Sequence, residues 1–430
     1  YVKNREFGDT TQEMDWDIYN RFDYDAYGTT QATIDYLGQE EYDRLRIYER
    51  QLKSENIKNN KPGWKLRDYA IREGLPGESA AKGSDHVKFV GNRGNSPTSQ
   101  GNLHDPPLEI PPWTGTPEEA SRMMRTVIML RGGIQVGFCE IDDKSRRFFY
   151  SKRGGKIHTF EDIDDAYETG DKLACPNKAK YVASYTAPMS EEMLRRAPSA
   201  IAASTVNHGY SYGRIINNGV SKFLWGIGYM GLGGGNNSWK IHPAFAVWTG
   251  IGEESRMHQN FVSPEQGCSA RTFAIVSELP MESTPPIDAG IWKYCHTCKK
   301  CAQGCPGEAL DKEGNEPTWD TPYGPTNTPG QKAFPFSFGM CRAFWMQNPG
   351  GCCTCMSLCP FSHKYQGLIH DVINATIGTT SIFNGFFKNM DDMLGYGFEA
   401  DQEAWWDLPP LVHGIWAPGS QFQQTVNIKE

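Results

Sequence analysis

The sequence contains no hydrophobic run long enough to form a membrane-spanning helix. Such a helix needs about 18 consecutive apolar residues, and the apolar block VIML at 127–130 is followed by Arg131 and two glycines. We therefore expect no transmembrane helix. A twin-arginine export signal is also missing, because the pair RR occurs only at 146–147 and 195–196, well inside the chain. The first residue is Tyr1 rather than methionine, so we expect that an N-terminal segment has been cleaved or left out.

The chain also lacks an excess of positive charge. Its 43 Lys and Arg residues are outnumbered by 51 Asp and Glu residues, which gives a net charge of −8 and a pI near 5.8. A nucleic-acid substrate is therefore not favoured, because proteins that bind polyanions carry a basic surface. Charged residues make up 22% and hydrophobic residues 38% of the chain, as in ordinary soluble globular proteins. A length of 430 residues is enough for one large core or for two to three domains.

Cysteine is scarce outside one short region. Only Cys139, Cys175 and Cys268 lie elsewhere, whereas the other nine of the twelve cysteines fall between 295 and 359. The cysteines of a disulfide framework would be distributed along the whole chain. The clustering of nine cysteines in one region instead indicates ligands of an inorganic cofactor.

The segment CHTCKKCAQGCP (295–306) has the spacing of an iron–sulfur motif. In C-x2-C-x2-C one tight loop supplies three thiolates to a [4Fe–4S] cluster, and a fourth cysteine before proline, here Cys305, reaches a second cluster. A second motif is present at 352–360, with Cys341 upstream. We assign the first cluster to Cys295, Cys298, Cys301 and Cys359, and the second to Cys341, Cys352, Cys355 and Cys305. Cys353 is left over as a buried or outer thiol. Structural zinc also accepts C-x2-C pairs, but eight cysteines in this crossed order favour iron–sulfur clusters.

The N-terminal third contains one sharply marked helix. Residues 1–80 are polar, aromatic and acidic, with a helical stretch at 34–52. Residues 81–112 are rich in Gly, Ser, Asn and Pro, a composition typical of a long surface loop. Thr116 then predicts an N-cap, with Pro117 at the first helical position and Glu119 closing a capping box. Gly132 ends this helix.

Helices and strands alternate over roughly 115–285, which predicts an α+β domain. The expected strands are 134–141, 146–151, 180–188 and 270–279. Ser190 opens a helix that Pro198 interrupts, a long helix follows at about 211–230, and the glycine-rich turn GLGGGNN (231–237) leads to a further helix. The sequence has no internal repeat apart from the two cysteine motifs, and its tail after 365 is aromatic.

Several of these segments together resemble the corrinoid-dependent respiratory reductive dehalogenases. The resemblance extends from about 113 to 400 and rests, besides the two cysteine motifs, on TGTPEEA (114–120), FEDIDDAYETGDKL (160–173), PNKAKYV (176–182) and MDDMLGYG (390–397). The first hundred residues match this family only loosely.

The resemblance implies an α+β fold in four parts. Residues 1–112 would wrap the core, 113–285 would form a nitroreductase-like cobalamin-binding domain, 286–365 a ferredoxin-like module with two [4Fe–4S] clusters, and 366–430 a tail packed on the core. In this family the cobalamin is held base-off without a histidine ligand from the protein, and the sequence accordingly lacks a D-x-H-x-x-G corrinoid motif.

The resemblance assigns the proton donor to Tyr210 of GYSYG (209–213), with Tyr212 as the alternative. A phenol is a poor acid at neutral pH, so the donor needs a nearby cation to stabilise its phenolate. Arg271 matches the family's cation, and Asn237 matches its active-site asparagine.

Further residues are implied to surround the substrate and the corrin. The substrate pocket would include Trp345, Trp113 and Tyr212, and the corrin would contact Gly235, Asn236, Ser238, Arg256 and Met257. The sequence departs from the family at Val206, where some members have threonine, and in the three glycines before the asparagines. Both departures affect the expected size of the substrate.

The implied activity is replacement of chlorine by hydrogen in a small chlorinated hydrocarbon. The pattern is nearest the branch that acts on chloroalkanes such as chloroform or trichloroethane, with a chloroethene as the alternative. The implied partners are an external low-potential electron donor and a small integral-membrane anchor protein, and the implied location is the outer face of the cytoplasmic membrane after twin-arginine export. Two other interpretations stay open: an enzyme like epoxyqueuosine reductase, which the acidic, repeat-free chain disfavours, and a ferredoxin-type electron carrier.

Overall fold

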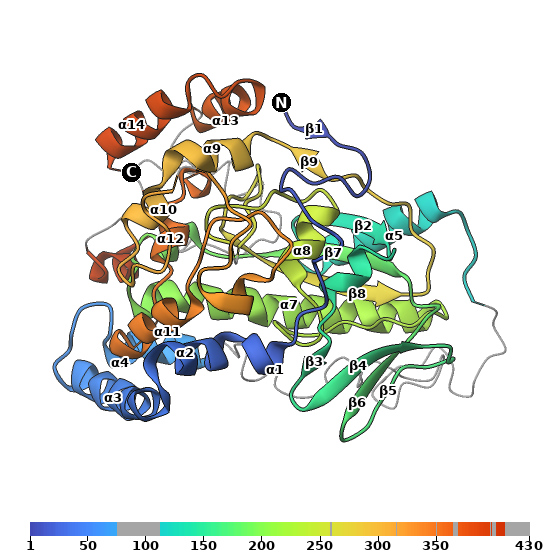
Figure 1. Ribbon diagram of the computed structural model, residues 1–430, viewed down its shortest axis with the longest axis horizontal. Coiled ribbons are helices and arrows are strands. Elements are labelled where there is room, and N and C mark those ends of the chain that lie inside the picture. Colours follow the sequence, from blue (N-terminus) through green and yellow to red (C-terminus); the bar gives the residue numbers. More distant parts are fainter. Residues whose placement is uncertain are drawn as a thin grey trace.

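A three-stranded antiparallel sheet lies at the centre of the chain (Figure 1). The computed structural model describes residues 1–74, 112–258, 260–314, 316–349, 351–363, 369–395, 397 and 401–408. The sheet has the order β2-β7-β8, formed by Val136–Glu140, Tyr181–Pro188 and Ala270–Ser277. These strands confirm the predictions for 134–141, 180–188 and 270–279.

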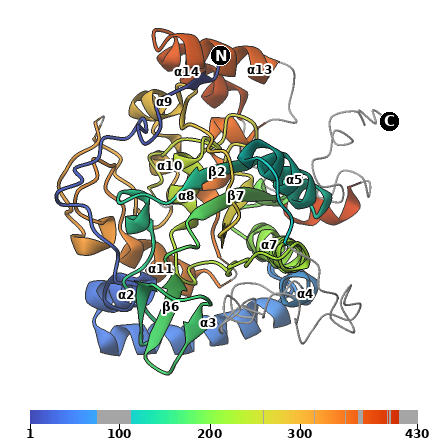
Figure 2. The ribbon, with the colours of Figure 1, turned by 90° about the vertical axis from the view of Figure 1, so that its right-hand side faces the viewer.

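Helices cover both faces of this sheet. Side chains of a strand alternate between its faces, so Phe138, Tyr185 and Phe273 point to one face and Cys139, Val182 and Ala274 to the other. Helices α5 (Pro117–Leu130) and α7 (Ala200–Gly226) pack on the first face, and α8 (His242–Trp248) packs on the second. Figure 2 shows α7 end-on beside the sheet. The sheet is therefore the middle layer of a helix–sheet–helix arrangement.

Helix α5 begins as the sequence predicts. The Thr116 hydroxyl accepts the Glu119 backbone N–H at 3.2 Å, and the Glu119 carboxylate accepts the Thr116 backbone N–H at 2.8 Å. Both bonds of the capping box are thus present.

Helix α7 is longer than predicted. It begins at Ala200, where the Ser199 hydroxyl accepts the Ala202 backbone N–H at 3.1 Å, and not near 211. The short helix α6 (Glu191–Leu194), capped by Ser190, precedes it, and Pro198 separates the two as expected. GYSYG therefore lies inside a helix rather than at its start.

The predicted strand at 146–151 is wrong. Residues Ser145–Phe148 form the 3₁₀ helix η2, because Asp142 and Ser145 bond to each other's backbone N–H groups at 2.7 and 2.9 Å and nucleate a turn. A second sheet of order β3-β4-β6-β5 follows, in which β4 and β6 are parallel. Its strands are β3 (Lys152–Arg153), β4 (Lys156–Glu161), β5 (Tyr167–Glu168) and β6 (Lys172–Pro176).

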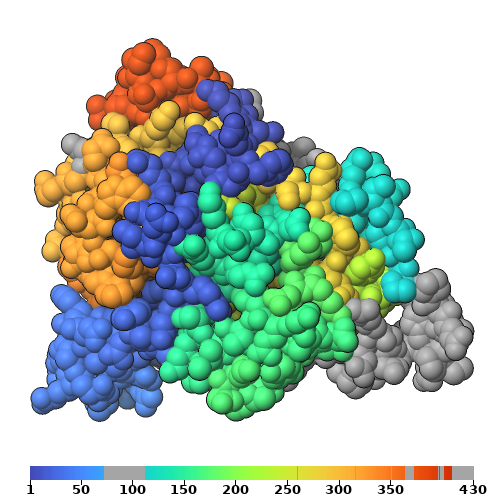
Figure 3. Space-filling view, turned by 45° about the vertical axis from the view of Figure 1, so that its right-hand side comes forward, coloured from blue at the N-terminus to red at the C-terminus, as the bar shows by residue number. Residues whose placement is uncertain are grey.

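The N-terminal region lies across the surface of the body. The predicted helix at 34–52 is two helices, α2 (Thr29–Leu37) and α3 (Gln39–Lys58), because Gly38 between them has φ of 81°. Figure 3 shows this region as a blue band between the cysteine-rich segment and the second sheet. Its remaining elements are β1 (Lys3–Asn4), paired with β9 (Ile287–Asp288), then α1 (Tyr24–Tyr27) and α4 (Leu66–Gly74). The predicted surface loop at 81–112 lies outside the described residues except for Pro112.

The cysteines are carried mainly by short helices. These are α9 (Ile291–Cys298), α10 (Lys300–Gln303), α11 (Phe338–Gln347) and α12 (Thr354–Ser357), with 3₁₀ helices η3 (Gly324–Asn327) and η4 (Pro360–Ser362). Helix α11 packs on α2 and α3, and α10 packs on α12.

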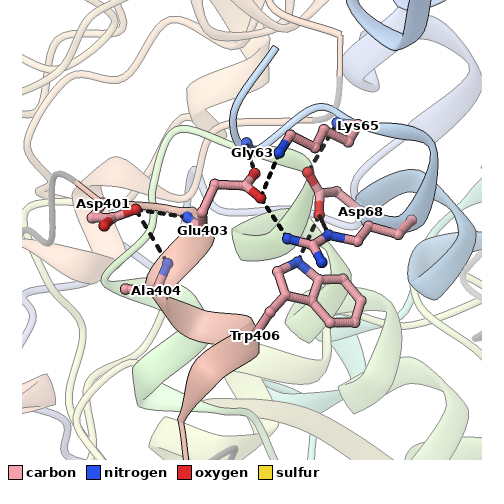
Figure 4. Close-up of polar contacts among 8 residues, drawn as sticks. Gly63, Lys65, Asp68, Asp401, Glu403, Ala404 and Trp406 are labelled. Carbon is pink, nitrogen blue, oxygen red and sulfur yellow. Dashed lines mark hydrogen bonds and ion pairs between the residues drawn. The ribbon is translucent and has the colours of Figure 1, made fainter. Parts of the chain in front are cut away.

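Two parts of the C-terminal segment pack back on the body. Helices α13 (Ile369–Thr379) and α14 (Asn384–Leu394) cover α9. The 3₁₀ helix η6 (Glu403–Asp407) packs beside the start of α4. There Glu403 accepts hydrogen bonds from the Gly63 backbone N–H at 3.3 Å and from the Lys65 ammonium at 2.8 Å (Figure 4). Trp406 donates to Asp68 at 2.8 Å in the same cluster. None of the helices described here has the length and apolar character needed to cross a bilayer.

Candidate active site

Tyr210 and Arg271 face each other across the contact between α7 and β8. The central carbon of the Arg271 guanidinium lies 5.3 Å from the centre of the Tyr210 ring, which is within cation–π distance. Both side chains are half-buried. The structure therefore brings together the predicted proton donor and the predicted cation.

Two glycines of α7 make this contact possible. A Cβ at Gly209 would lie 2.7 Å from Arg271 Cγ, and a Cβ at Gly213 would lie 2.0 Å from the Phe273 ring. Four residues of an α-helix advance about 6 Å, and two residues of a strand advance about 6.6 Å. The two glycines of GYSYG thus match two successive side chains on one face of β8, and each side chain lies where a Cβ is missing.

Phe273 connects this contact to the glycine-rich loop. Its ring packs edge-on against Tyr210 with centroids 6.5 Å apart, stacks on Tyr185 of the neighbouring strand at 5.7 Å, and lies 5.7 Å from His242. The His242 Nε2 atom is 3.0 Å from the Gly235 carbonyl oxygen. Burial lowers the pKa of His242 to about 3, so this ring is neutral.

The carbonyls of the three consecutive glycines are held by buried side chains. Asn217 of α7 donates to the Gly234 carbonyl at 2.9 Å, and both Trp239 and Lys240 donate to the Gly233 carbonyl at 2.7 Å. Burial holds the pKa of Lys240 well below its usual range. The loop is therefore fixed to the body by its carbonyl oxygens.

Asn237 belongs to a separate hydrogen-bonded group. Its backbone is left-handed, with φ of 52°, its Oδ1 accepts the Tyr150 hydroxyl at 3.2 Å, and its Nδ2 donates to the Tyr24 hydroxyl at 3.2 Å. Asn236 and Ser238 beside it are half-buried. The Ser238 hydroxyl oxygen is buried and has no hydrogen-bond partner among the described residues. A ligand with peripheral amides fits this site, because it would satisfy that hydroxyl.

The predicted pocket aromatics lie in three places. Tyr212 stacks on His208 at 4.7 Å, on the same helix as Tyr210. Trp345 lies on α11 with the Arg342 guanidinium 5.7 Å from its ring centre. The Trp113 backbone bonds to the Ile227 carbonyl at 2.9 Å, and Ile227 is 17 residues after Tyr210, roughly 25 Å along the helix axis. The roles of all three in a substrate pocket stay predictions.

Two further contacts of Arg271 could not be predicted from the sequence. Its Nη1 donates to Asn260 Oδ1 at 3.3 Å, and its Nη2 lies 3.9 Å from the Met356 sulfur. Met356 is buried in α12. Alternation along β8 could have placed Phe273 beside Arg271, but only the tertiary structure brings in Asn260 and Met356.

The four cysteines of the first predicted set line one small cavity. Cys295, Cys298, Cys301 and Cys359 form its wall together with Arg256, Met257 and Lys299. A [4Fe–4S] cluster binds each thiolate to a different iron atom, so its ligands surround a space rather than converge on one point. This donor set fits an iron–sulfur cluster.

The second predicted set repeats the local backbone of the first. Lys299 begins α10 with φ of 55°, and Cys353 begins α12 with φ of 63°. Each left-handed residue is the first intervening position of a C-x2-C pair, 298–301 and 352–355. The leftover cysteine, Cys353, therefore occupies the turn position that Lys299 occupies in the first motif.

Thiols within each predicted set lie close enough to raise one another's pKa. Burial raises the pKa of Cys341, and the neighbouring Cys352 and Cys305 raise it further. Burial likewise raises the pKa of Cys298 to about 12, with Cys359 adding to the effect. Buried thiols of this kind lose their protons when a metal binds them.

Arg256 lies beside the first set of cysteines. Its guanidinium is buried, donates to the Cys295 carbonyl at 3.0 Å and lies 3.8 Å from the centre of the Phe334 ring. Met257 packs in the same apolar cluster as Cys298 and Cys359. As corrin contacts, Arg256 and Met257 stay predictions.

Comparison with known families places the chain beside one group. A family model described as "Reductive dehalogenase subunit" matches residues 1–160 and 147–281. Over 342 residues the chain is 30% identical to the trichloroethene reductive dehalogenase of Dehalococcoides mccartyi strain 195, covering 71% of this chain and 60% of that protein. The tetrachloroethene reductive dehalogenase of Sulfurospirillum multivorans is 29% identical, with 74% of this chain and 65% of that protein covered.

Solved structures share the fold. The catabolic reductive dehalogenase NpRdhA matches with a TM-score of 0.64 and 19% identity, covering 93% of this chain and 49% of that chain. A reductive dehalogenase whose structure is described as suggesting a mechanism for B12-dependent dehalogenation matches with a TM-score of 0.65 and 18% identity, covering 93% and 50%. The mixed helix and sheet architecture is therefore that of reductive dehalogenase structures, and the chain spans about half the length of these matched chains.

Proposed function

The chain belongs to the reductive dehalogenase family, and on that premise we propose that it replaces chlorine by hydrogen in a small chlorinated hydrocarbon. The observation that carries the proposal is the Arg271 guanidinium held 5.3 Å from the centre of the Tyr210 ring. The net reaction consumes two electrons and one proton for each carbon–chlorine bond and releases chloride. The protein must therefore supply an electron path and a proton donor at one place.

Proteins of this family depend on a corrinoid and on iron–sulfur centres. We propose two [4Fe–4S] clusters, bound in the crossed order by Cys295, Cys298, Cys301 and Cys359 and by Cys341, Cys352, Cys355 and Cys305. We further propose that the corrinoid is bound base-off against the loop of Gly235, Asn236 and Ser238, where the Ser238 hydroxyl offers an unused hydrogen-bonding group. The bound corrinoid would supply the reduced cobalt that cleaves the carbon–chlorine bond, and the clusters would supply its electrons one at a time.

The proton comes from Tyr210. A phenol has an ordinary pKa of about 10, so it donates a proton readily only where its phenolate is stabilised. Arg271 provides that stabilisation by its charge and its position. The ring of Phe273 excludes water on one side of the pair, which strengthens the attraction between the phenolate and the guanidinium.

The substrate is proposed to be a chloroalkane such as chloroform. The relatives named above act, by their names, on trichloroethene and tetrachloroethene, so a chloroethene is the second candidate. The two classes differ in shape, because a chloroethene is planar and a chloroalkane is tetrahedral.

The partners and the location are also part of the proposal. We propose an external low-potential electron donor and a small integral-membrane anchor protein, which together would place the enzyme on the outer face of the cytoplasmic membrane after twin-arginine export. A helix able to cross the bilayer is not found in the part of the chain that the structure describes.

An anaerobic chloride-release assay tests the function. The protein is supplied with cobalamin and reduced methyl viologen and incubated separately with chloroform and with trichloroethene. We expect chloride release with formation of dichloromethane from chloroform. Turnover of trichloroethene alone would replace the proposed substrate by the second candidate. Iron-containing protein that carries electrons but releases no chloride from either compound would contradict the function and favour an electron carrier.

A further inference from the structure

Arg271 is a half-buried cation without a carboxylate partner. Among the described residues, no Asp or Glu oxygen lies within ion-pair distance of its guanidinium, and its Nε is buried without a hydrogen-bond partner there. Burial of an unpaired charge is unfavourable, and the buried Arg256 compensates for it by donating to three backbone carbonyls. The surroundings of this arginine therefore need an explanation.

Two uncharged acceptors hold the guanidinium instead. The Asn260 side-chain oxygen lies 3.3 Å from Nη1, and the Met356 sulfur lies 3.9 Å from Nη2. An amide oxygen and a thioether fix the direction of a guanidinium, but neither cancels its charge. A carboxylate in either place would form an ion pair and reduce the field that the guanidinium exerts on Tyr210.

Both acceptors are themselves held in place. Asn260 lies in a loop closed by paired backbone hydrogen bonds between Glu253 and Val262 at 3.0 and 2.9 Å, and its own carbonyl accepts the Ser255 hydroxyl at 2.7 Å. Met356 is 4% exposed and lies between Cys355 and Cys359, one cysteine from each predicted cluster. The arginine is thus anchored to the loop beside the first cluster and to the helix that carries a ligand of the second.

We propose that Asn260 and Met356 are positioning residues that hold Arg271 over Tyr210 through neutral contacts, so that the full charge of the guanidinium stays available to the proton donor. The inference rests on the proposed function of Tyr210 and Arg271. It adds a requirement that the acceptors be uncharged, which a purely structural role does not impose.

The comparison of Asn260→Asp with Asn260→Ala tests this requirement. Asp has nearly the same shape as Asn and keeps an acceptor, so a purely structural role predicts that Asn260→Asp is the milder change. Our proposal predicts the reverse: Asn260→Asp lowers kcat about 10- to 100-fold, with KM and iron content unchanged, and Asn260→Ala lowers it less. Activity of Asn260→Asp equal to or above that of Asn260→Ala would overturn the proposal.

A second readout does not depend on turnover. With 3-fluorotyrosine at position 210 of the holoenzyme, the ¹⁹F chemical shift reports ionisation of that phenol as the pH is varied. We expect Asn260→Asp to raise the apparent pKa of the fluorophenol by about 1 or more, as removal of a nearby opposite charge does, and Asn260→Ala to change it less. An unchanged titration in Asn260→Asp overturns the inference even in an active enzyme. Absence of chloride release by the unsubstituted protein would instead count against the proposed function and leave the titration interpretable.

Met356 offers an independent test with a matched control. Met356→Leu conserves volume and removes the sulfur acceptor, and Met346→Leu makes the same change at a fully buried position in the separate cluster formed with Tyr42 and Leu45. We expect a several-fold lower kcat and a larger solvent isotope effect in Met356→Leu only. Equal behaviour of the two variants would remove Met356 from the proposal.

Discussion

The Tyr210–Arg271 contact and the cysteine-bearing helices position their functional side chains in different ways. Around Tyr210 a long helix and a strand pack in register, and the side chains of β8 lie against Gly209 and Gly213. Around the cysteines, short helices begin at left-handed residues, Lys299 and Cys353. Contacts between one helix and one strand define most of the first region, with Asn260 and Met356 added from a loop and from α12, whereas the second surrounds a space lined by thiols.

This difference predicts different responses to mutation. Buried thiols with raised pKa values stay protonated unless a metal binds them, so we expect the cysteine region to respond to mutation through its metal content. The contact of α7 with β8 is formed mainly by apolar packing, and we expect it to persist without a cofactor. Substitutions in the cysteine region should therefore change metal content, and substitutions in the helix–strand contact should change kinetics or packing alone.

The largest effect is expected from Cys305→Ala. In the crossed assignment this cysteine of the first motif binds the second cluster, so the variant should lose about four of eight iron atoms and all turnover, while the EPR signal of the first cluster persists. Cys353→Asn is the matched control, because asparagine accepts the left-handed backbone and the crossed assignment leaves this thiol without iron. A Cys305→Ala protein with its full iron content would break the assignment.

Tyr210→Phe removes the donor and leaves the ring packing intact. We expect kcat to fall by about 10²- to 10⁴-fold, the usual contribution of a general acid, without loss of iron. Tyr212→Phe, which retains its ring stacked on His208, should keep wild-type kinetics. If the two variants show the opposite pattern, Tyr212 is the donor.

Gly209→Ala and Gly213→Ala test the register of helix and strand. The first places a Cβ 2.7 Å from Arg271 Cγ and should lower kcat about tenfold by moving the guanidinium. The second places a Cβ 2.0 Å from the Phe273 ring and should lower the free energy of unfolding by about 1–3 kcal/mol. Gly226→Ala, at the end of the same helix, has open space around the new Cβ and should be neutral or slightly stabilising. Equal unfolding midpoints for all three variants would argue against the register.

The smallest effect concerns Glu254, in the loop that carries Asn260. Burial raises the pKa of this carboxyl from 4.5 to about 8, so the folded state keeps a proton that the unfolded state releases between these pH values. The free energy of unfolding should therefore fall as the pH rises from about 4.5 to 8. Glu254→Gln removes this dependence and should be about 1–3 kcal/mol more stable than wild type at pH 8.

Denaturant titrations at both ends of this pH range measure the difference. Wild type and Glu254→Gln should have similar midpoints at the acid end, and activity should be unaffected. A wild-type midpoint that rises between these pH values relative to the variant would show that the carboxyl is charged in the folded state.

Local signals predicted the elements that local contacts stabilise. The capping box of Thr116 and Glu119 was readable because both bonds span three residues. The strand predicted at 146–151 is wrong because these residues follow directly on the turn that Asp142 starts. The start of α7 cannot be predicted in this way, because residues 200–204 (AIAAS) have no charged residue and therefore no amphipathic pattern.

The residues of the candidate site likewise fall into those that could be predicted from the sequence and those that could not. Tyr210 and Arg271 came from the resemblance to a family, and their contact agrees with it. Asn260 and Met356 lie 11 and 85 residues from Arg271 in sequence, and no spacing rule connects a loop, a strand and a cysteine-bearing helix. Such contacts depend on how the two regions pack together.

The most direct test is metal analysis of the anaerobically purified protein after supply of cobalamin. The account predicts about eight iron atoms and one cobalt atom per chain, with the cobalt lost on denaturation. Iron without cobalt would contradict the central claim that the two cysteine-bound clusters serve a corrinoid beside Tyr210 and Arg271.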